Sequence, residues 1–432
     1  MSDHTGTQDK SIYERRESVV RSYCRAFPTS FNKAKGEYLT GEDGRDYIDF
    51  LAGCSTLNYG HNHPDLQAAL VEYIQSDGVT HGLDMHTDAK ATFLEAFERI
   101  ILKPRGLDYR LMFPGPTGAN AVEAALKAAR KATGRHNVIA FTNGFHGMTT
   151  GALSCTGNSG KRAGAGIPLC GTSHEPFDGY FGPDVDTAEQ LDRRLSDTSS
   201  GVDAPAAIIV ETVQGEGGLN AASDEWLRKI EKIARKHGAV FIIDDIQAGC
   251  GRTGGFFSFE RAGVKPDIVT LAKSISGLGL PLSLTLIRPE FDLWKPGEHN
   301  GTFRGNNHAF VTATRALELF WSDDALEKAV ERKSDYLKKR LSEIVASARI
   351  AKRVKGRGMM RGIEMPSGEI AGDICAKCFE DGLVIETSGS DDEVVKILCP
   401  LTISEDALTR GLDILAAAVA TVDAEQRERA AA

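Results

Sequence analysis

A carboxylate and an amine each end an apolar segment of the kind that forms a buried strand. Asp244 ends residues 239–244, and Lys273 ends residues 268–273. In an α/β fold, ligands bind in the crevice at the carboxyl ends of parallel strands, so the two groups are expected to meet there. A lysine that forms a Schiff base, together with an aspartate that faces a pyridinium nitrogen, indicates pyridoxal phosphate chemistry. Taken alone, the pair fits a salt bridge at the edge of the sheet equally well.

The segment 113–120 has the features of an anion site at the start of a helix. Free backbone N–H groups and the helix dipole at such a terminus bind anions, and Gly118 lets the backbone approach a phosphate closely. Phe145, within residues 143–147, follows the next predicted strand and could stack on a flat ring. Because glycine-rich helix starts and buried aromatic turns are common, neither segment decides the function by itself.

In combination, these segments resemble one family. The order and spacing are similar to those of class III (ω-amino acid) pyridoxal phosphate aminotransferases at residues 117–119, residues 145–147, Asp244, Gln247, residues 251–254 and Lys273. The resemblance covers about residues 15–420. It implies pyridoxal 5'-phosphate as the cofactor, a fold-type I architecture, and active sites at the interface of a homodimer or higher homo-oligomer.

The resemblance also gives each matching residue an expected role. Lys273 would bond covalently to the cofactor and then move the proton at the reacting carbon, while Asp244 would keep the ring nitrogen protonated. Gln247 would hydrogen-bond the ring hydroxyl oxygen, and Phe145 and Ile246 would cover the two ring faces. The expected cofactor-binding set is Phe145, His146, Asp244, Ile246, Gln247 and Lys273, with Thr117, Gly118, Ala119 and the neighbouring subunit's Thr302 on the phosphate.

Two further residues are expected to face the substrate. Glu211 matches a family carboxylate beside the substrate, where it would accept an ammonium group. Lys396 stands where many members carry an arginine for the α-carboxylate of glutamate, and a lysine offers a point charge instead of a two-pronged donor. The chain departs from the family pattern twice more, because Ala119 replaces a hydroxyl residue and Phe145 replaces an aromatic hydroxyl.

Several stretches narrow the expected reaction. They are similar to those of members that move an amino group from L-glutamate to L-aspartate 4-semialdehyde, and they include residues 82–87, 211–218, 294–306 and 386–389. The products would be L-2,4-diaminobutyrate and 2-oxoglutarate, in the first step of biosynthesis of the osmoprotectant ectoine. The alternatives are a transaminase for ornithine, acetylornithine or 4-aminobutyrate, a racemase or aminomutase on the same fold, and a binding protein without turnover. The presence of Lys273 and Asp244 disfavours the last of these.

The elements that must position these residues alternate between apolar strands and amphipathic helices. Strands are predicted at residues 138–141, 206–211, 239–244 and 268–273, with helices between them such as 120–133. This alternation predicts an α/β chain with a large, doubly wound, mostly parallel sheet. A long helical stretch is predicted at residues 309–348. A small α/β domain is expected to form from both termini, so the chain divides into residues 1–58, 59–329 and 330–432.

Composition bounds the remaining possibilities. The 432 residues carry a formal charge of −9, which disfavours a nucleic-acid-binding surface. No apolar run reaches the length that spans a bilayer, and residues 1–10 lack the apolar region of a secretory signal, so a cytoplasmic enzyme is expected. Cys375 and Cys378 form a C-x-x-C pair, but no second ligand pair lies near them in the sequence, so no metal site is expected.

Overall fold

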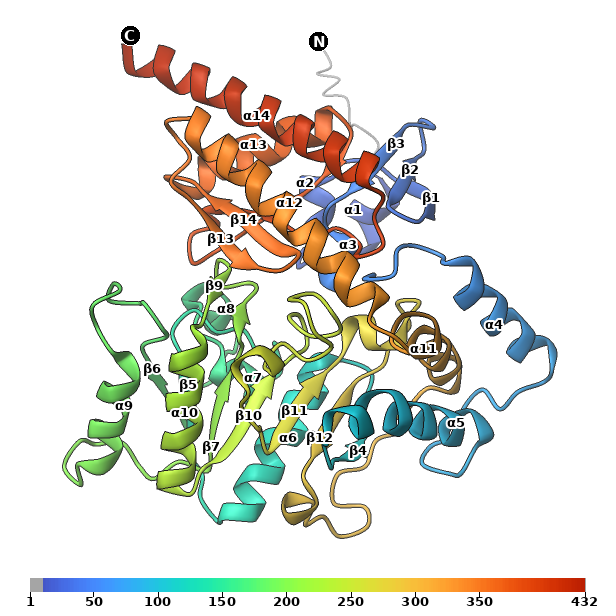
Figure 1. Cartoon of the computed structure of the whole chain (residues 1–432), viewed down its shortest axis with the longest axis vertical. Helices are drawn as coiled ribbons and strands as arrows, with labels where there is room; N and C mark the ends of the chain where they lie inside the picture. Colours follow the sequence, from blue (N-terminus) through green and yellow to red (C-terminus); the bar gives the residue numbers. More distant parts are fainter. Residues whose placement is uncertain (1–10, 432) are drawn as a thin grey trace, which may run out of the picture.

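A seven-stranded sheet forms the centre of the computed structural model, which describes residues 11–431 (Figure 1). β10 pairs in parallel with β7 and β11, and β5 pairs in parallel with β6 and β7, whereas β12 runs antiparallel to both of its neighbours. In spatial order the strands are β4 (Arg110–Met112), β12 (Leu284–Ile287), β11 (Ile268–Leu271), β10 (Val240–Asp244), β7 (Ala207–Val210), β5 (Val138–Phe141) and β6 (Thr172–Glu175). The predicted mostly parallel sheet is confirmed.

Helices cover both faces of this sheet. Phe241 of β10 enters the hydrophobic core that contains α10 (Asp224–His237), whereas Ile242 enters the core that contains α6 (Gly118–Thr133). Because successive strand residues point to opposite faces, α10 and α6 lie on opposite sides of the sheet. The sheet is therefore doubly wound, as the alternation of strands and helices predicts.

A second, smaller α/β part lies above the large sheet in Figure 1 and draws on both ends of the chain. One of its sheets joins β1 (Phe31–Lys35), β2 (Tyr38–Gly41) and β3 (Asp46–Asp49) to β15 (Leu383–Val384). The other contains β13 (Arg353–Arg357), β14 (Met360–Glu364), β17 (Val394–Ile397) and β16 (Glu386–Ser388). The parallel pairing of β15 with β3 ties the C-terminal part to the N-terminal part. The domain boundaries after residues 58 and 329 stay predictions, and the second falls inside a continuous helix.

The helix that contains residue 329 is one of two helices in a region where the sequence predicts one long helical stretch. The long helical stretch predicted over 309–348 divides into two helices, α11 (Asn307–Phe320) and α12 (Ala325–Ser347), which are separated by residues 321–324. Ser322, Asp323 and Asp324 occupy the break, and such side chains compete with helical hydrogen bonds and favour caps and turns.

The strand predicted to end at Lys273 is also shorter than expected. β11 ends at Leu271, and Lys273 begins a 3₁₀ turn (Lys273–Ser276) with a φ of 55°. A non-glycine residue rarely adopts this left-handed conformation, and it commonly does so at functional sites. The turn redirects the lysine side chain out of the plane of the sheet and toward the smaller α/β part.

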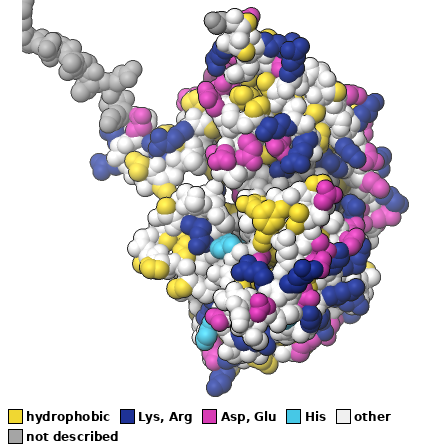
Figure 2. Space-filling view, turned by 90° about the vertical axis from the view of Figure 1, so that its left-hand side faces the viewer, with side chains coloured by type: hydrophobic (Ala, Val, Ile, Leu, Met, Phe, Trp, Pro, Cys, Tyr) yellow, Lys and Arg dark blue, Asp and Glu magenta, His cyan; other side chains and the backbone are white. Residues whose placement is uncertain are grey.

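The remaining elements connect these layers. They are α1 (Ile12–Arg16), α2 (Tyr23–Ala26), α3 (Ala52–Ser55), α4 (Pro64–Gln75), α5 (Asp88–Phe97), α7 (Thr150–Cys155), α8 (Ser159–Ala163), β8 (Val213–Gln214), β9 (Asn220–Ala221), α9 (Thr187–Ser196), α13 (Gly368–Glu380) and α14 (Glu405–Ala431). Of the helices within residues 11–431, none combines the length and apolarity needed to cross a membrane. Basic and acidic side chains are interspersed on the face that Figure 2 presents.

Candidate active site

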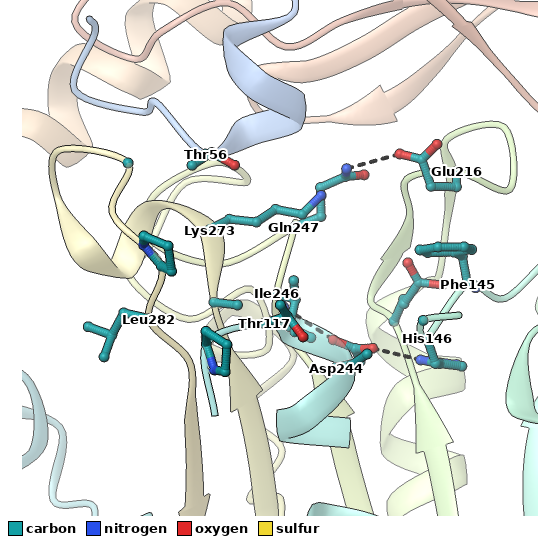
Figure 3. A pocket seen from close by; sticks show the side chains of 18 of the residues that line it. Thr56, Thr117, Phe145, His146, Glu216, Asp244, Ile246, Gln247, Lys273 and Leu282 are labelled. Atoms are coloured by element: carbon teal, nitrogen blue, oxygen red, sulfur yellow. Dashed lines mark hydrogen bonds and ion pairs between the residues drawn. The ribbon is translucent and has the colours of Figure 1, made fainter. Parts of the chain in front are cut away.

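A cavity of about 380 Å³ opens at the carboxyl ends of β10 and β7, under the smaller α/β part (Figure 3). Ten of the twelve predicted site residues line it, namely Thr117, Gly118, Ala119, Phe145, His146, Glu211, Asp244, Ile246, Gln247 and Lys273. Lys396 and Thr302 are the two that do not. The sheet topology explains the convergence, since strand ends and the start of α6 meet at one edge.

Asp244 is the anchor of the cavity floor. It ends β10, it is 4% exposed, and its carboxylate accepts hydrogen bonds from the Thr270 hydroxyl (3.0 Å) and the Ile246 N–H (3.3 Å). Its other oxygen lies 2.7 Å from Nδ1 of His146. Burial disfavours a charged His146, but the hydrogen bond and the charge of Asp244 outweigh burial and raise the pKa of His146. These three contacts hold the Asp244 carboxylate in one orientation at the end of β10.

Lys273 and Gln247 approach the cavity from its upper side. Lys273 donates from Nζ to the Cys54 carbonyl over 2.9 Å, and Gln247 Nε2 donates to the same carbonyl over 3.3 Å. Gln247 Nε2 also reaches Glu216 Oε1 at 3.1 Å. Within residues 11–431, the buried Oε1 of Gln247 has no hydrogen-bond partner. A buried acceptor in this condition requires a donor, which a ligand in the cavity can supply.

The start of α6 forms the end wall of the cavity. Thr117 is the N-cap of this helix, and the Thr117 hydroxyl donates to Asn120 Oδ1 over 2.8 Å. The first backbone N–H groups of a helix have no intrahelical acceptor, so those of Gly118 and Ala119 are available to an anion. A Cβ on Gly118 would lie 2.9 Å from the Ile246 side chain, so a glycine is needed for this close approach.

Glu211 lies in the cavity wall with its oxygens already engaged. It accepts hydrogen bonds from the backbone N–H of Phe145 (2.9 Å) and of Gly215 (3.4 Å). Burial raises the pKa of Glu211 to about 7. Through its hydrogen bond from the Phe145 N–H, the Glu211 side chain fixes the loop that carries the Phe145 ring. Its predicted contact with a substrate ammonium stays a prediction.

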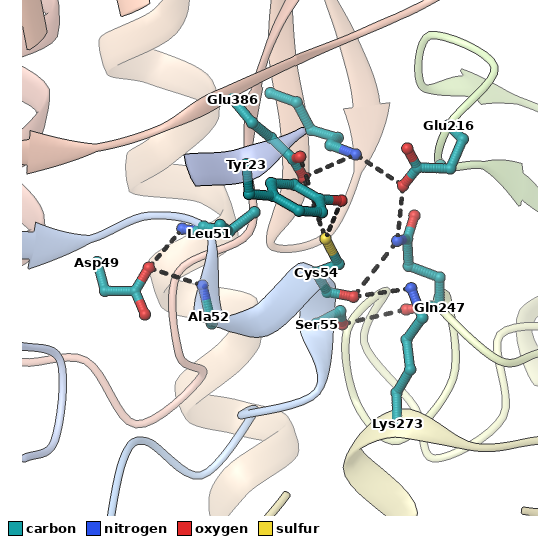
Figure 4. Close-up of polar contacts among 12 residues, drawn as sticks. Tyr23, Asp49, Leu51, Ala52, Cys54, Ser55, Glu216, Gln247, Lys273 and Glu386 are labelled. Carbon is teal, nitrogen blue, oxygen red and sulfur yellow. Dashed lines mark hydrogen bonds and ion pairs between the residues drawn. The ribbon is translucent and has the colours of Figure 1, made fainter. Parts of the chain in front are cut away.

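Lys396 lies behind the cavity wall instead of in it. Its side chain is fully buried, and Nζ lies 2.9 Å from Glu216 Oε1 and 3.0 Å from Glu386 Oε1 (Figure 4). The charges of Glu216 and Glu386 outweigh burial and raise the pKa of Lys396, and that lysine in turn lowers the pKa of Glu216. Glu216 lines the cavity and so separates Lys396 from it.

A polar cluster above the cavity is not indicated by the sequence motifs. The Tyr23 hydroxyl lies 2.9 Å from the Cys54 sulfur, which lies 3.7 Å from Glu386 Oε1. Cys54 sits in α3, where Ala52 to Ser55 all have positive φ and turn the Cys54 carbonyl toward Lys273. Glu216 stands within the stretch 211–218 that carried the resemblance, so it could have been found. Tyr23, Cys54 and Glu386 come from opposite ends of the chain, and no local signal connects them.

Thr302 occupies an exposed position outside this cavity. Thr302 is predicted to contact the phosphate bound by a neighbouring subunit, and this contact stays a prediction. Its sequence neighbour Phe303 is 68% exposed, and the Phe303 ring lies 5.3 Å from that of His81. The side chains of Leu83 and Met85 are also exposed, at 50% and 57% respectively.

The chain belongs to the class-III aminotransferases, whose family model matches residues 21–419. A diaminobutyrate–2-oxoglutarate transaminase of Nocardia farcinica is 57% identical, over 96% of this chain and 95% of that protein. One of Halomonas elongata is 58% identical, over 94% and 97%. A solved ornithine aminotransferase of Toxoplasma gondii, with pyridoxal phosphate at partial occupancy in its active site, is 28% identical with a TM-score of 0.83 over 95% and 94%.

The cavity fits the family's cofactor. Asp244 offers a fixed carboxylate to a protonated ring nitrogen, Gln247 offers an unsatisfied acceptor to the ring hydroxyl, and the start of α6 offers N–H groups to a phosphate. The protein is therefore an aminotransferase with pyridoxal phosphate as its cofactor.

Proposed function

We propose that the enzyme transfers the amino group of L-glutamate to L-aspartate 4-semialdehyde and so forms L-2,4-diaminobutyrate and 2-oxoglutarate, the first step of ectoine biosynthesis. The observation that carries amino transfer is the meeting of Lys273 and Asp244 in one cavity that the start of α6 also lines. The substrates rest on relatives named diaminobutyrate–2-oxoglutarate transaminase, which are 55–58% identical over nearly the whole chain.

The proposed division of labour follows from where each side chain lies. When bound, the cofactor supplies an electron sink for the carbanion at the reacting carbon. Lys273 is the proposed base that takes the proton from that carbon and returns it to the product, because its amine enters the cavity from the upper side and donates there to the Cys54 carbonyl. Asp244 keeps the ring nitrogen positive, and His146 holds Asp244 in place. Phe145 and Ile246 lie where they can enclose the ring.

The two substrates place different demands on the upper side of the cavity. Glutamate carries a carboxylate on its reacting carbon, whereas diaminobutyrate reacts at a terminal carbon without one. Lys396 can serve the glutamate carboxylate only if Glu216 moves out of the cavity wall, because Glu216 now covers it. Glu216 is better placed than Glu211 for such a movement, since backbone N–H groups hold the Glu211 oxygens.

The assembly is proposed to be a homodimer or higher homo-oligomer in which Thr302 reaches the partner's phosphate site. The exposed apolar side chains of Leu83, Met85 and Phe303 beside this segment support an interface there. Replacing Phe303 with Asp should lower the oligomer mass in sedimentation and weaken cofactor binding together. An unchanged mass would contradict the proposal.

The test of the reaction is a product assay with purified holoenzyme. With glutamate and aspartate 4-semialdehyde supplied, diaminobutyrate and 2-oxoglutarate should appear in equal amounts. Ornithine, acetylornithine and 4-aminobutyrate are the competing amino donors, and each should give a kcat/KM lower than that of diaminobutyrate in the reverse direction. A higher value for one of them would retain the class of enzyme and replace the substrate.

A further inference from the structure

The residues of α3, 52–55, form a turn of left-handed backbone beside the active-site cavity. Their φ angles are 45°, 57°, 55° and 72° in chain order. Only Gly53 is a glycine, and in the other three residues this conformation brings the Cβ atom close to the following carbonyl oxygen. Residues other than glycine adopt it singly and not in a run, so this turn persists only because the surrounding structure holds it.

Asp49 holds the beginning of the turn. Oδ1 of its carboxylate accepts hydrogen bonds from the backbone N–H groups of Leu51 and Ala52, both over 2.8 Å (Figure 4). The other oxygen, Oδ2, lies 2.7 Å from Nε2 of His61. Asp49 is buried, and hydrogen bonds are stronger in the low dielectric of the interior than in water. The start of the turn is therefore fixed by a carboxylate that is itself held in place.

Arg252 holds the end of the turn through the hydroxyl of Ser55. Its Nε donates to that hydroxyl over 2.9 Å, and its Nη2 donates to Asn58 Oδ1. Its Nη1 donates to the backbone carbonyls of Met359 (3.2 Å) and Cys399 (2.6 Å). Arg252 is fully buried, so no bulk water competes for these donors. One guanidinium from the large α/β part thus joins the turn to two segments of the smaller part.

The turn presents a single backbone acceptor to two residues of the active-site cavity. The Cys54 carbonyl accepts hydrogen bonds from Lys273 Nζ (2.9 Å) and Gln247 Nε2 (3.3 Å), as Figure 4 shows. The Ser55 hydroxyl also lies 3.3 Å from the backbone carbonyl oxygen of Gln247. Because the peptide group is planar, the φ and ψ angles of the turn set the direction of the Cys54 carbonyl. The left-handed turn therefore decides where the Lys273 amine is held.

We propose that Ser55 and Arg252 are positioning residues for amino transfer, because they keep the turn left-handed and so direct the Cys54 carbonyl at the Lys273 amine. Neither Ser55 nor Arg252 lines the cavity, so both act through the backbone of the turn. The inference rests on the proposed role of Lys273 as the residue that bonds to the cofactor and moves the proton. It is independent of which amino acids react.

A purely structural role for the turn leads to a different expectation. If the turn only joined the two α/β parts, loosening it would weaken the binding of every cavity ligand alike. If it positions the amine, loosening it changes the reaction of Lys273 and leaves the contacts of Asp244 and α6, which lie within the large α/β part, unchanged.

Two forms of the cofactor separate these roles. The aldehyde carbon of pyridoxal phosphate bonds to the lysine nitrogen with release of one water. Pyridoxamine 5'-phosphate carries an amine in place of the aldehyde, so it occupies the same cavity but forms no bond to the lysine. The first compound reports on the position of the Lys273 amine, and the second reports on the rest of the cavity.

The test compares Ser55→Ala with the wild-type full-length enzyme after both have been freed of cofactor. At saturating pyridoxal phosphate, the visible band should form on the order of 10- to 100-fold more slowly in Ser55→Ala, because a small misplacement of a reacting group costs about this much. The affinity for pyridoxamine 5'-phosphate should be unchanged. In the reloaded enzymes, kcat should fall by a similar factor, whereas KM should not change.

Two further variants sharpen the comparison. Arg252→Lys retains the charge but loses the fork of donors that reaches Ser55 and Asn58, so it should show the same pattern as Ser55→Ala. Ser154→Ala is the matched control, because it removes the hydroxyl of another buried serine, one that donates to the Gly151 carbonyl and does not line the cavity. Band formation in Ser154→Ala should match that of the wild type.

An unchanged rate of band formation in Ser55→Ala would overturn the inference, and so would equal losses for the two cofactor forms. A faster rate would also overturn it, because the carbonyl would then hold the amine away from the cofactor. If Ser55→Ala does not fold, Ser55→Gly takes its place, since glycine adopts a positive φ without strain. A band that forms at the wild-type rate in Lys273→Ala would overturn the proposed role of Lys273 itself, and only that result removes the role and the inference together.

Discussion

The lower and upper sides of the active-site cavity are built by different parts of the chain. On the lower side, Asp244 stands at the end of β10 and contacts His146, and the start of α6 lies against the same sheet. On the upper side, Glu216 meets Lys396 of β17 and Glu386 of β16, which are neighbouring strands in one sheet of the smaller α/β part. The lower side is thus built within one sheet and its helices, whereas the upper side depends on contacts between the two α/β parts. Substitutions should therefore act differently on the two sides.

The largest effect is expected at the lysine that links the two sides. Lys273→Ala should lower kcat on the order of 10⁴-fold, because the general base at the reacting carbon is lost. Cofactor affinity should fall less, because the contacts of Asp244 and α6 remain. Single-turnover kinetics and cofactor titration measure the two quantities separately. A kcat within about tenfold of wild type would show that another group moves the proton.

The lower side should respond in chemistry more than in stability. Asp244→Asn should lower kcat on the order of 10²-fold, since a carboxylate beside a cationic nitrogen raises the pKa of that nitrogen by about 1–3 units. The same change should lower the pKa of His146, which loses the hydrogen bond and charge that now raise it. Thr270→Val removes one hydrogen bond to Asp244 and retains its charge, so it is the matched control. Equal losses in the two variants would contradict this account.

The upper side should respond in stability. Lys396→Met leaves the largely buried Glu216 and Glu386 without their shared cation, so the free energy of unfolding should fall by about 3–5 kcal/mol. Lys396→Arg retains the charge and should cost less. Urea unfolding at fixed protein concentration measures both variants. If Lys396→Met changed the free energy of unfolding by less than about 1 kcal/mol, the ion cluster would not stabilise the contact between the two parts.

A dependence of stability on pH is expected at Asp245, next to Asp244 on the lower side. Burial raises the pKa of Asp245 to about 7, so the folded protein holds this proton to a higher pH than the unfolded chain does. Stability should consequently fall as pH rises from about 4 to 7, by up to about 4 kcal/mol from this group. Asp245→Asn should remove that part of the slope in unfolding measurements across this range. If the slope of stability against pH is unchanged in Asp245→Asn, other groups cause the pH dependence.

The contrast between the two sides also explains what could be predicted from the sequence. The lower side could be predicted, because Asp244 and Thr117 each stand where an apolar strand or a helix meets a loop. The turn at Lys273 could not, since its left-handed φ depends on the surrounding fold. The cluster of Tyr23, Cys54 and Glu386 is formed by the pairing of both chain ends, and periodicity within a segment carries no information about such pairing.

The fate of the glutamate nitrogen tests the central claim most directly. The holoenzyme would be supplied with ¹⁵N-labelled L-glutamate and unlabelled L-aspartate 4-semialdehyde, and the product would be analysed by NMR. Diaminobutyrate with the label in its 4-amino group is expected, together with 2-oxoglutarate in equal amount. Recovery of all label in glutamate, with no diaminobutyrate formed, would contradict the assignment of both substrates.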